Sequence, residues 1–265
     1  MKVKLNHTEY SGVELEGECL FVHLQSGSKR ELQNRVKDYA VTVVEQSLHL
    51  IVFLLDDTVW HYYGTGELKQ ERLEIGGPYG RGSRLIADSY GRLHLLYVTV
   101  QSKGFGNILR HQIYSGEWSK PILVSTNVFG GSGDGFSAAW GVDGYLHLAY
   151  CSYGDGNLLY RVFHPEQGVW SGAVPFSKTR CHQPQFLHTS LLCLVWIEEG
   201  RFSVVKMLLK RENWTKPMIV SRPETHGVNV GFNITASEVE VLWMQGNRMF
   251  KVSLQDLTDS IPVER

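Results

Sequence analysis

The chain has 265 residues, of which 43% are hydrophobic and 20% are charged. This is enough apolar material for a sizeable core, and a formal net charge of −1 gives no electrostatic argument for nucleic acid or an anionic membrane as a partner. The most apolar stretch, residues 48–55, is too short to span a bilayer, and the N-terminus lacks the apolar run of a secretory signal. We therefore expect a cytoplasmic protein that binds neither nucleic acid nor membranes.

The four cysteines contain no CxxC pair, and Cys19 and Cys193 lie inside apolar, strand-like runs. A free cysteine in such a run packs as a small hydrophobic side chain. We expect four reduced thiols, as is usual in the cytoplasm, with no metal and no cofactor.

Strand-like segments begin at the N-terminus and continue along the chain. Residues 2–7 and 19–24 have strand character, and residues 30–34 form a further short segment. From residue 47 onward one apolar strand recurs five times, and its equivalent positions are occupied by His49, His94, His147, Cys193 and Glu240. These positions are 45, 53, 46 and 47 residues apart, which is the period of a repeat protein.

Each recurring strand belongs to a larger unit of four short strands. A short strand and a reverse turn precede it, an apolar strand follows it, and three of the units then continue with Trp118, Trp170 or Trp214 in nearly identical W-S/T segments. Units of 45–50 residues with four strands are typical of β-propeller blades. Neighbouring blades cover both faces of each sheet, which explains why the recurring strand is apolar at almost every position.

The sequence therefore predicts an all-β fold, a single β-propeller domain over residues 1–265 with six four-stranded blades. Residues 1–35 would form a divergent blade, because counting 45 residues back from His49 leads to the strand-like segment at residues 2–7. The alternative is a five-bladed propeller with an N-terminal extension.

The recurring G-x-L-H-L-x-Y strand, followed by an apolar strand and a W-S-x-P segment, resembles the sialidase-like (BNR-type) propeller superfamily. The resemblance rests on the repeat architecture from residue 36 to residue 264. The resemblance implies a propeller fold. The superfamily includes glycosidases, glycan-binding lectins and other binding modules. The Asp-box turn S-x-D-x-G-x-T-W is absent from the sequence, and fold alone transfers no catalytic residue.

The repeated histidines His49, His94 and His147 could suggest a metal site. They occupy equivalent positions in different blades, however, and Cys193 and Glu240 replace them in the sister blades. We interpret them as packing residues between blades.

A binding site is predicted at one end of the propeller. Loops between blades and loops joining the second and third strands of a blade emerge on the same face, where a rigid scaffold commonly carries its site. The residues that we nominate there for ligand binding are Tyr79, Arg81, Asp134, Arg180, His182 and His226. Arginine suits carboxylates or phosphates, and aromatic faces suit sugars or peptide side chains. We expect any pocket to open here rather than at the opposite face, which has short Asp/Gly/Ser turns.

These residues favour binding over catalysis. A hydrolase needs a paired acid and base, and Asp134 is the one carboxylate that we nominate near this mouth, with His182 or His226 as its partner. The function we infer is a non-catalytic binding or interaction scaffold for a protein or a glycan. The alternative is a glycan-active hydrolase or lyase of sialidase-like fold.

Overall fold

The computed structural model describes residues 2–5, 7, 9–101, 106–129, 135–188, 191–200, 203–210, 213–220, 228–234, 239–245 and 248–253. The chain divides into two compact units, Met1–Gly133 and Asp134–Arg265. Among the described residues there is no helix that could cross a membrane.

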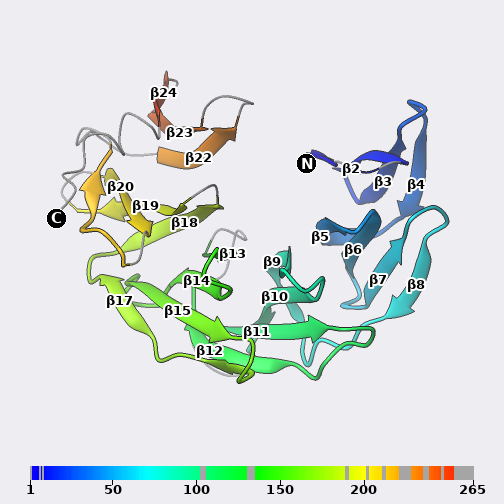
Figure 1. Ribbon diagram of the computed structural model, residues 1–265, viewed down its shortest axis with the longest axis horizontal. Coiled ribbons are helices and arrows are strands. Elements are labelled where there is room, and N and C mark those ends of the chain that lie inside the picture. The colour runs from blue at the N-terminus through cyan, green and yellow to red at the C-terminus, as the bar shows by residue number, and fades with distance from the viewer. Residues whose placement is uncertain are drawn as a thin grey trace. The chain divides into compact units, whose positions relative to one another are not determined.

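Unit 1 contains three antiparallel sheets of four strands, and in each sheet every strand pairs with its neighbours in the chain (Figure 1). The first sheet comprises β1 (Lys2–Lys4), β2 (Tyr10–Glu16), β3 (Cys19–Leu24) and β4 (Lys29–Gln33). The second comprises β5 (Val36–Val44), β6 (Ser47–Leu54), β7 (Val59–Gly64) and β8 (Lys69–Arg72). The third comprises β9 (Tyr79–Ala87), β10 (Leu93–Val100), β11 (Asn107–Tyr114) and β12 (Ile122–Val128).

Unit 2 repeats this pattern with small variations. Its first sheet, the fourth in the chain, comprises β13 (Phe136–Trp140), β14 (Leu146–Cys151) and β15 (Leu158–His164), with β16 (Val169–Trp170) and β17 (Val174–Ser177) both pairing with β15. The fifth sheet comprises β18 (Cys181–His188), β19 (Leu192–Glu199), β20 (Ser203–Lys210) and β21 (Met218–Ile219). The sixth comprises β22 (Val228–Ile234), β23 (Val239–Gln245) and β24 (Arg248–Ser253).

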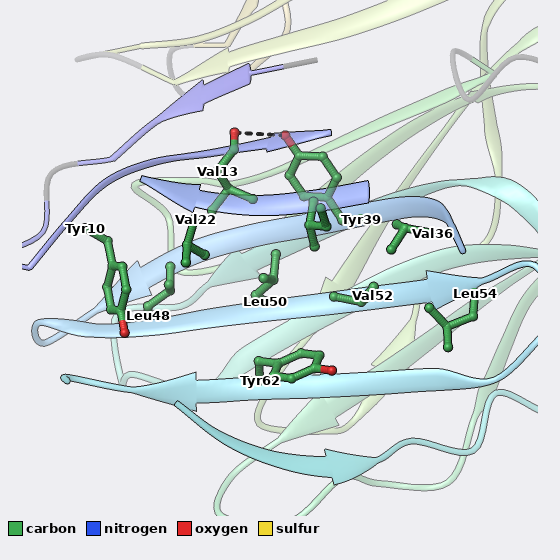
Figure 2. Packing of buried hydrophobic residues seen from close by; sticks show 11 residues of the cluster. Tyr10, Val13, Val22, Val36, Tyr39, Leu48, Leu50, Val52, Leu54 and Tyr62 are labelled. Carbon is green, nitrogen blue, oxygen red and sulfur yellow. Dashed lines mark hydrogen bonds between the residues drawn. The ribbon is translucent and has the colours of Figure 1, made fainter. Parts of the chain in front are cut away.

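The recurring apolar strand is buried on both faces, as its sequence predicts. Side chains alternate between the two faces of a strand. Leu48, Leu50 and Val52 of β6 pack against the first sheet in one core cluster, shown in Figure 2. Ile51 and Phe53 of the same strand pack against the third sheet in another. Burying each such side chain contributes about 1.5–3 kcal/mol to the free energy of folding, so the strand stabilises the packing of both neighbouring sheets.

The N-terminal sheet confirms a sixth repeat in place of an extension. Its second strand is β2, however, whereas counting 45 residues back from His49 leads to Lys4 in β1. The first repeat is therefore shorter than the others. One face of this sheet packs on the second sheet, where the Tyr39 hydroxyl donates to the Val13 carbonyl at 3.3 Å.

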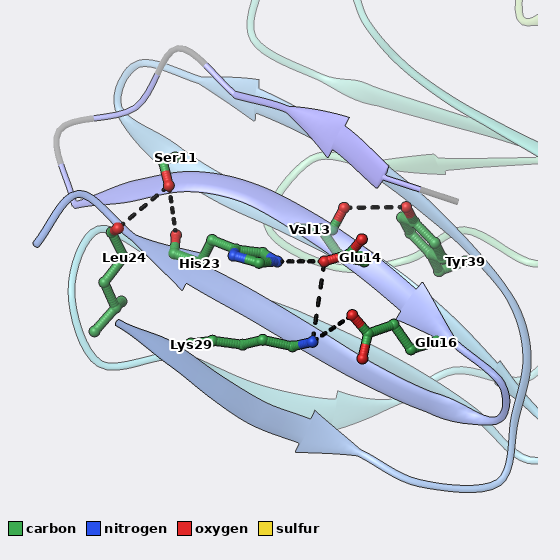
Figure 3. A network of polar contacts seen from close by, with 8 residues as sticks. All are labelled: Ser11, Val13, Glu14, Glu16, His23, Leu24, Lys29 and Tyr39. Atoms are coloured by element: carbon green, nitrogen blue, oxygen red, sulfur yellow. Dashed lines mark hydrogen bonds and ion pairs between the residues drawn. The ribbon is translucent and has the colours of Figure 1, made fainter. Parts of the chain in front are cut away.

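The other face of the first sheet is polar (Figure 3). There Glu14 accepts from the His23 ring at 2.8 Å, and the Lys29 ammonium lies 2.5 Å from a Glu16 carboxylate oxygen. These groups are partly exposed, so each ion pair contributes little to stability.

The repeated histidines have a structural explanation. Each histidine lies on the second strand of its sheet. Its side chain contacts a residue of the third strand that precedes the directly paired residue by two positions. The pairs are His49–His61, His94–His111 and His147–Tyr160, with nitrogen or oxygen atoms 3.1, 3.0 and 2.5 Å apart. At the same diagonal in the sixth sheet Glu240 pairs with Lys251 at 2.5 Å. This diagonal side-chain contact therefore joins the second and third strands, and the residue types that form it differ from sheet to sheet.

Two tryptophans of the W-S/T segments contact these pairs from a neighbouring sheet. Trp118 of the third sheet donates its indole N–H to Nδ1 of His61 in the second sheet at 3.1 Å. In unit 2 the Trp214 ring meets Tyr160 of the preceding sheet edge-on, with centroids 5.4 Å apart. Packing between sheets is thus confirmed for His49 and His147, whose rings lie 6.0 and 6.5 Å from those of Tyr114 and Trp214 in the next sheet. Among the described residues no cluster of three or more His, Cys, Asp or Glu side chains is arranged to hold a metal ion.

Candidate functional site

The residues predicted from sequence lie partly in strands. We expected Tyr79, Arg81 and His182 in loops, but β9 begins at Tyr79 and β18 at Cys181, so all three lie near the starts of first strands. Arg180 lies just before β18, as expected for a loop residue. Asp134 and His226 fall outside the described residues. The four described candidates divide between the two units.

Tyr79 is a core residue of unit 1. Only 1% of it is exposed, and its ring stacks on Phe53 with centroids 3.8 Å apart. Its hydroxyl donates to the Asp38 carboxylate, and the Lys37 ammonium donates to its carbonyl at 2.7 Å. Burial and the adjacent Asp38 charge raise the pKa of Tyr79 well above its ordinary value. Its polar groups are thus engaged inside the protein.

Arg81 is exposed and lies in a bulge of β9. Tyr79 pairs with Thr99 and Ser83 with Tyr97, so two additional residues are accommodated on β9. Arg81 takes a φ of 71°, in the left-handed region that non-glycine residues rarely adopt. Bulges re-aim side chains and are frequent near binding sites, which keeps Arg81 as a candidate.

In unit 2 the structure brings Arg180 and His182 together at Glu199. Arg180 Nε and His182 Nδ1 lie 3.3 and 3.4 Å from the two carboxylate oxygens. The backbone fixes this arrangement, because the Glu199 amide donates to the Arg180 carbonyl at 2.7 Å. Gly156 packs so closely that a Cβ there would lie 2.5 Å from Arg180 Cγ. Sequence reasoning missed Glu199, although its place in β19 opposite β18 follows from the strand register.

This cluster is open to solvent. The Arg180 side chain is 64% exposed and that of Glu199 is 44% exposed, so water screens their attraction. Glu198 precedes Glu199 in the same strand and therefore faces the other side of the sheet, where it binds Lys206 at 2.7 Å. The two adjacent glutamates thus do not form an acid–base pair.

Unit 1 contains a cavity of about 440 Å³ between its second and third sheets. This size is in the range of small-molecule sites. Its walls are three turns, residues 44–47, 90–92 and 114–116, with His49 among the lining residues. These turns join first to second and third to fourth strands. The expectation that a pocket would open at the opposite, loop-rich face is therefore wrong for this cavity.

One wall is built by the turn that begins at Asp88. Its carboxylate is fully buried and accepts from the backbone amides of Tyr90 and Arg92, each at 2.8 Å, and from Arg92 Nε at 2.6 Å. His94 Nε2 lies 3.3 Å away on the core side. Burial opposes ionisation of Asp88, but these hydrogen bonds hold its pKa below the ordinary value. Asp88 therefore fixes the positions of Tyr90 and Arg92.

Tyr90 and Arg92 present an aromatic face and a cation to the cavity. Tyr90 is 73% exposed, and the Arg92 guanidinium lies over its ring, 5.2 Å from the centroid. Because only Nε of Arg92 is engaged by Asp88, its terminal N–H groups remain as donors on this side.

The facing wall is the turn at Glu45 and Gln46. Both residues have positive φ, 48° and 63°, where an asparagine or glycine would be expected. Such a conformation costs about 1–2 kcal/mol per residue, and strain of this kind is concentrated at functional sites. A Cβ on Gly91 would lie 3.9 Å from Oε1 of Glu45, so the carboxylate faces the neighbouring turn. Within the described part of the chain this carboxylate has no hydrogen-bond or ion-pair partner.

The inner end of the cavity is aromatic. The Tyr114 ring lies 6.0 Å from the His49 ring and 5.0 Å from the His61 ring. Burial, with a smaller effect of the His61 charge, lowers the pKa of His49 to about 4. His49 is therefore neutral at physiological pH.

An ion pair occupies the corresponding place in unit 2. Lys210 occupies the position of Tyr114 at the end of the third strand, since it pairs with Leu192 as Tyr114 pairs with Leu93. Its ammonium lies 2.7 Å from Oδ2 of Asp143, in a turn of the preceding sheet. An ion pair thus spans the sheet interface here, where unit 1 leaves a cavity.

A smaller cavity of about 240 Å³ lies along residues 72–74 and 118–121. Its Gln112 amide is already engaged, since Nε2 donates to the Ser119 carbonyl and Oε1 accepts from the Tyr97 hydroxyl. The larger cavity is the better candidate site. The sequence signals for the larger cavity are the D-S-Y-G-R turn and the unusual E-Q hairpin turn, both of which look like ordinary turns in the sequence.

No protein-family model and no curated protein matches the sequence, whereas solved structures share its fold. BP39L lectin from Burkholderia pseudomallei superposes with a TM-score of 0.58 at 11% identity, over 92% of this chain and 80% of the lectin. AofleA from Arthrobotrys oligospora gives 0.54 at 10% identity, over 80% and 69% of the two chains. The six-bladed propeller lectin of Aleuria aurantia, described with a fucose recognition mode, gives 0.52 at 13% identity, over 88% and 89%. The all-β, six-bladed propeller class is therefore confirmed.

Proposed function

We propose that the chain is a non-catalytic carbohydrate-binding module, and that residues 1–265 form one propeller domain. The observation that carries the proposal is the cavity between the second and third sheets, with Tyr90, Arg92 and Glu45 on its walls. The likeness to propeller lectins supports it at the level of fold. A cytoplasmic location is part of the proposal, because all four cysteines are free.

The cavity offers what a sugar requires. Arg92 supplies donors and Glu45 supplies acceptors, so together they complement hydroxyl groups, which both donate and accept. The exposed Tyr90 ring offers a flat apolar face of the kind on which a sugar ring lies. The fixed turns keep the ordering cost of binding low, because the groups are already in place.

The loop-rich mouth is a second candidate location. In unit 2 Arg180 and His182 share Glu199, and in unit 1 Arg81 lies in a bulge with a left-handed backbone. A protein ligand, or glycan hydrolysis by a sialidase-like propeller, would be sited at that mouth. Among the described residues this exposed cluster holds one carboxylate, Glu199, whereas glycoside hydrolysis generally uses a pair of carboxyl groups, which favours binding at the cavity over hydrolysis at the mouth.

The test is a glycan array probed with the purified, labelled chain, followed by titration calorimetry on any glycan that binds. Tyr90→Ala should weaken binding by about tenfold or more, the effect of losing an aromatic contact. Tyr145→Ala is the matched control, since Tyr145 is also exposed and lies in the corresponding turn of the fourth sheet. Equal loss in both variants, or no bound glycan, would contradict the proposal.

A further inference from the structure

We infer that the cavity between the second and third sheets selects neutral saccharides and rejects acidic ones. This inference rests on the proposed function and specifies its ligand class. It depends on the charges that face the cavity, taken one group at a time.

The cation of the cavity is already neutralised. Arg92 is the basic residue among the lining residues, and its guanidinium is bound at 2.6 Å by the buried Asp88 carboxylate. Asp88 also accepts from two backbone amides, so its acceptors are saturated and its charge is fixed. Arg92 can donate hydrogen bonds to a ligand, but the Asp88–Arg92 pair presents no net positive charge to attract a carboxylate.

The remaining charge is negative. Glu45 faces the cavity from the other sheet, and its carboxylate has no cationic partner among the described residues. The left-handed backbone at Glu45 and Gln46 fixes the turn from which this exposed side chain extends, and its Oε1 lies near the Gly91 turn of the other sheet. A ligand carboxylate placed between these walls would meet a like charge that no cation offsets, and water screens part of the repulsion because Glu45 is exposed.

The other lining groups add no compensating positive charge. His49 is neutral because burial lowers its pKa to about 4, and the tyrosine and serine hydroxyls are uncharged. The groups facing His49 are His61, Tyr63 and Tyr114. Glu71 contacts the His61 ring. None of them is cationic at neutral pH, because burial also lowers the pKa of His61 to about 4.

Hydroxyl groups fit this arrangement where carboxylates do not. A sugar hydroxyl donates to Glu45 and accepts from Arg92 at once, whereas a carboxylate can only accept. At the corresponding place in unit 2, Lys210 and Asp143 satisfy each other, whereas Glu45 has no such cation across its interface among the described residues.

The experiment compares matched sugars that differ in one group. Methyl glycosides of glucose, galactose and mannose are titrated into the whole chain by calorimetry, beside the corresponding methyl uronosides, which carry a carboxylate at C6. The wild type should bind a neutral glycoside about tenfold or more tightly than its uronoside, a preference of about 1.4 kcal/mol. Glu45→Gln should reduce that preference, and Glu45→Lys should reverse it.

Two controls keep the outcomes separate. Lys210→Met removes a cation at the ion-paired interface of unit 2 and should leave both affinities unchanged, and the melting temperature of each variant checks its folding. Uronosides that bind as tightly as neutral glycosides, or a preference that survives in Glu45→Lys, would overturn the inference and leave carbohydrate binding standing. Failure of every sugar in both series would overturn the carbohydrate-binding proposal itself, and the inference with it.

Discussion

Asp88→Asn is the substitution that most directly tests the construction of the cavity. The amide can still accept from the backbone N–H groups of Tyr90 and Arg92 through its oxygen. Its NH2 group, however, would face Arg92 Nε and His94 Nε2, where the carboxylate now accepts. The variant loses a charge-assisted hydrogen bond in a buried position and places one donor against another.

The magnitude follows from the burial of the two partners. Breaking a buried, hydrogen-bonded ion pair costs about 3–5 kcal/mol, and a hydrogen bond to a charged group contributes about 1.5–3 kcal/mol. The Arg92 side chain is 32% exposed, so solvent recovers part of the loss. We expect the free energy of unfolding to fall by about 2–3 kcal/mol at neutral pH.

The assay is urea denaturation followed by tryptophan fluorescence, with Asp143→Asn as the control. Asp143 also contacts a histidine and a cation, but its side chain is 27% exposed, so its loss should cost about 1 kcal/mol or less. Since the pKa of Asp88 is lower in the folded chain, its contribution is present above about pH 4 and is lost as pH falls through the folded-state pKa. Equal effects of the two substitutions, or an Asp88→Asn deficit that persists unchanged in acid, would refute the reasoning.

Three further outcomes are expected. Burial lowers the pKa of His49 and His61 to about 4, so below about pH 6.5 the unfolded chain binds more protons than the folded chain. The free energy of unfolding, measured by urea denaturation, should therefore decline from about pH 6.5 to about pH 4. His61→Leu should flatten that decline. Thiol titration under denaturing, non-reducing conditions should count four free thiols, and a count of zero or two would indicate disulfides. Arg180→Ala and His182→Ala should each change the free energy of unfolding by less than about 0.5 kcal/mol, because both side chains are partly exposed; about tenfold weaker binding of an array-selected glycan in either variant would assign the ligand to the mouth.

Periodicity predicted much of the architecture. The strand around His94 recurs with a near-constant spacing, and its apolar residues on both faces require a sheet on either side, so the number and type of repeats could be counted from sequence. The strand-like segment predicted at residues 19–24 coincides with β3. The first strands were misjudged, since the bulges at Arg81 and Gln183 interrupt alternation and make a strand resemble a loop.

The sequence by itself determined that four-stranded units follow one another and that the repeated histidines occupy equivalent places on the second strands of their sheets, because both depend on local periodicity. Only the tertiary structure decided where the cavity lies. Glu45 and Arg92 lie in the first-to-second-strand turns of two different sheets, and both turns look ordinary in the sequence. At equivalent ends of third strands, Tyr114 borders the cavity in unit 1, whereas Lys210 pairs with Asp143 of the neighbouring sheet in unit 2. A contact across two sheets has no period in the chain, so no repeat could reveal it.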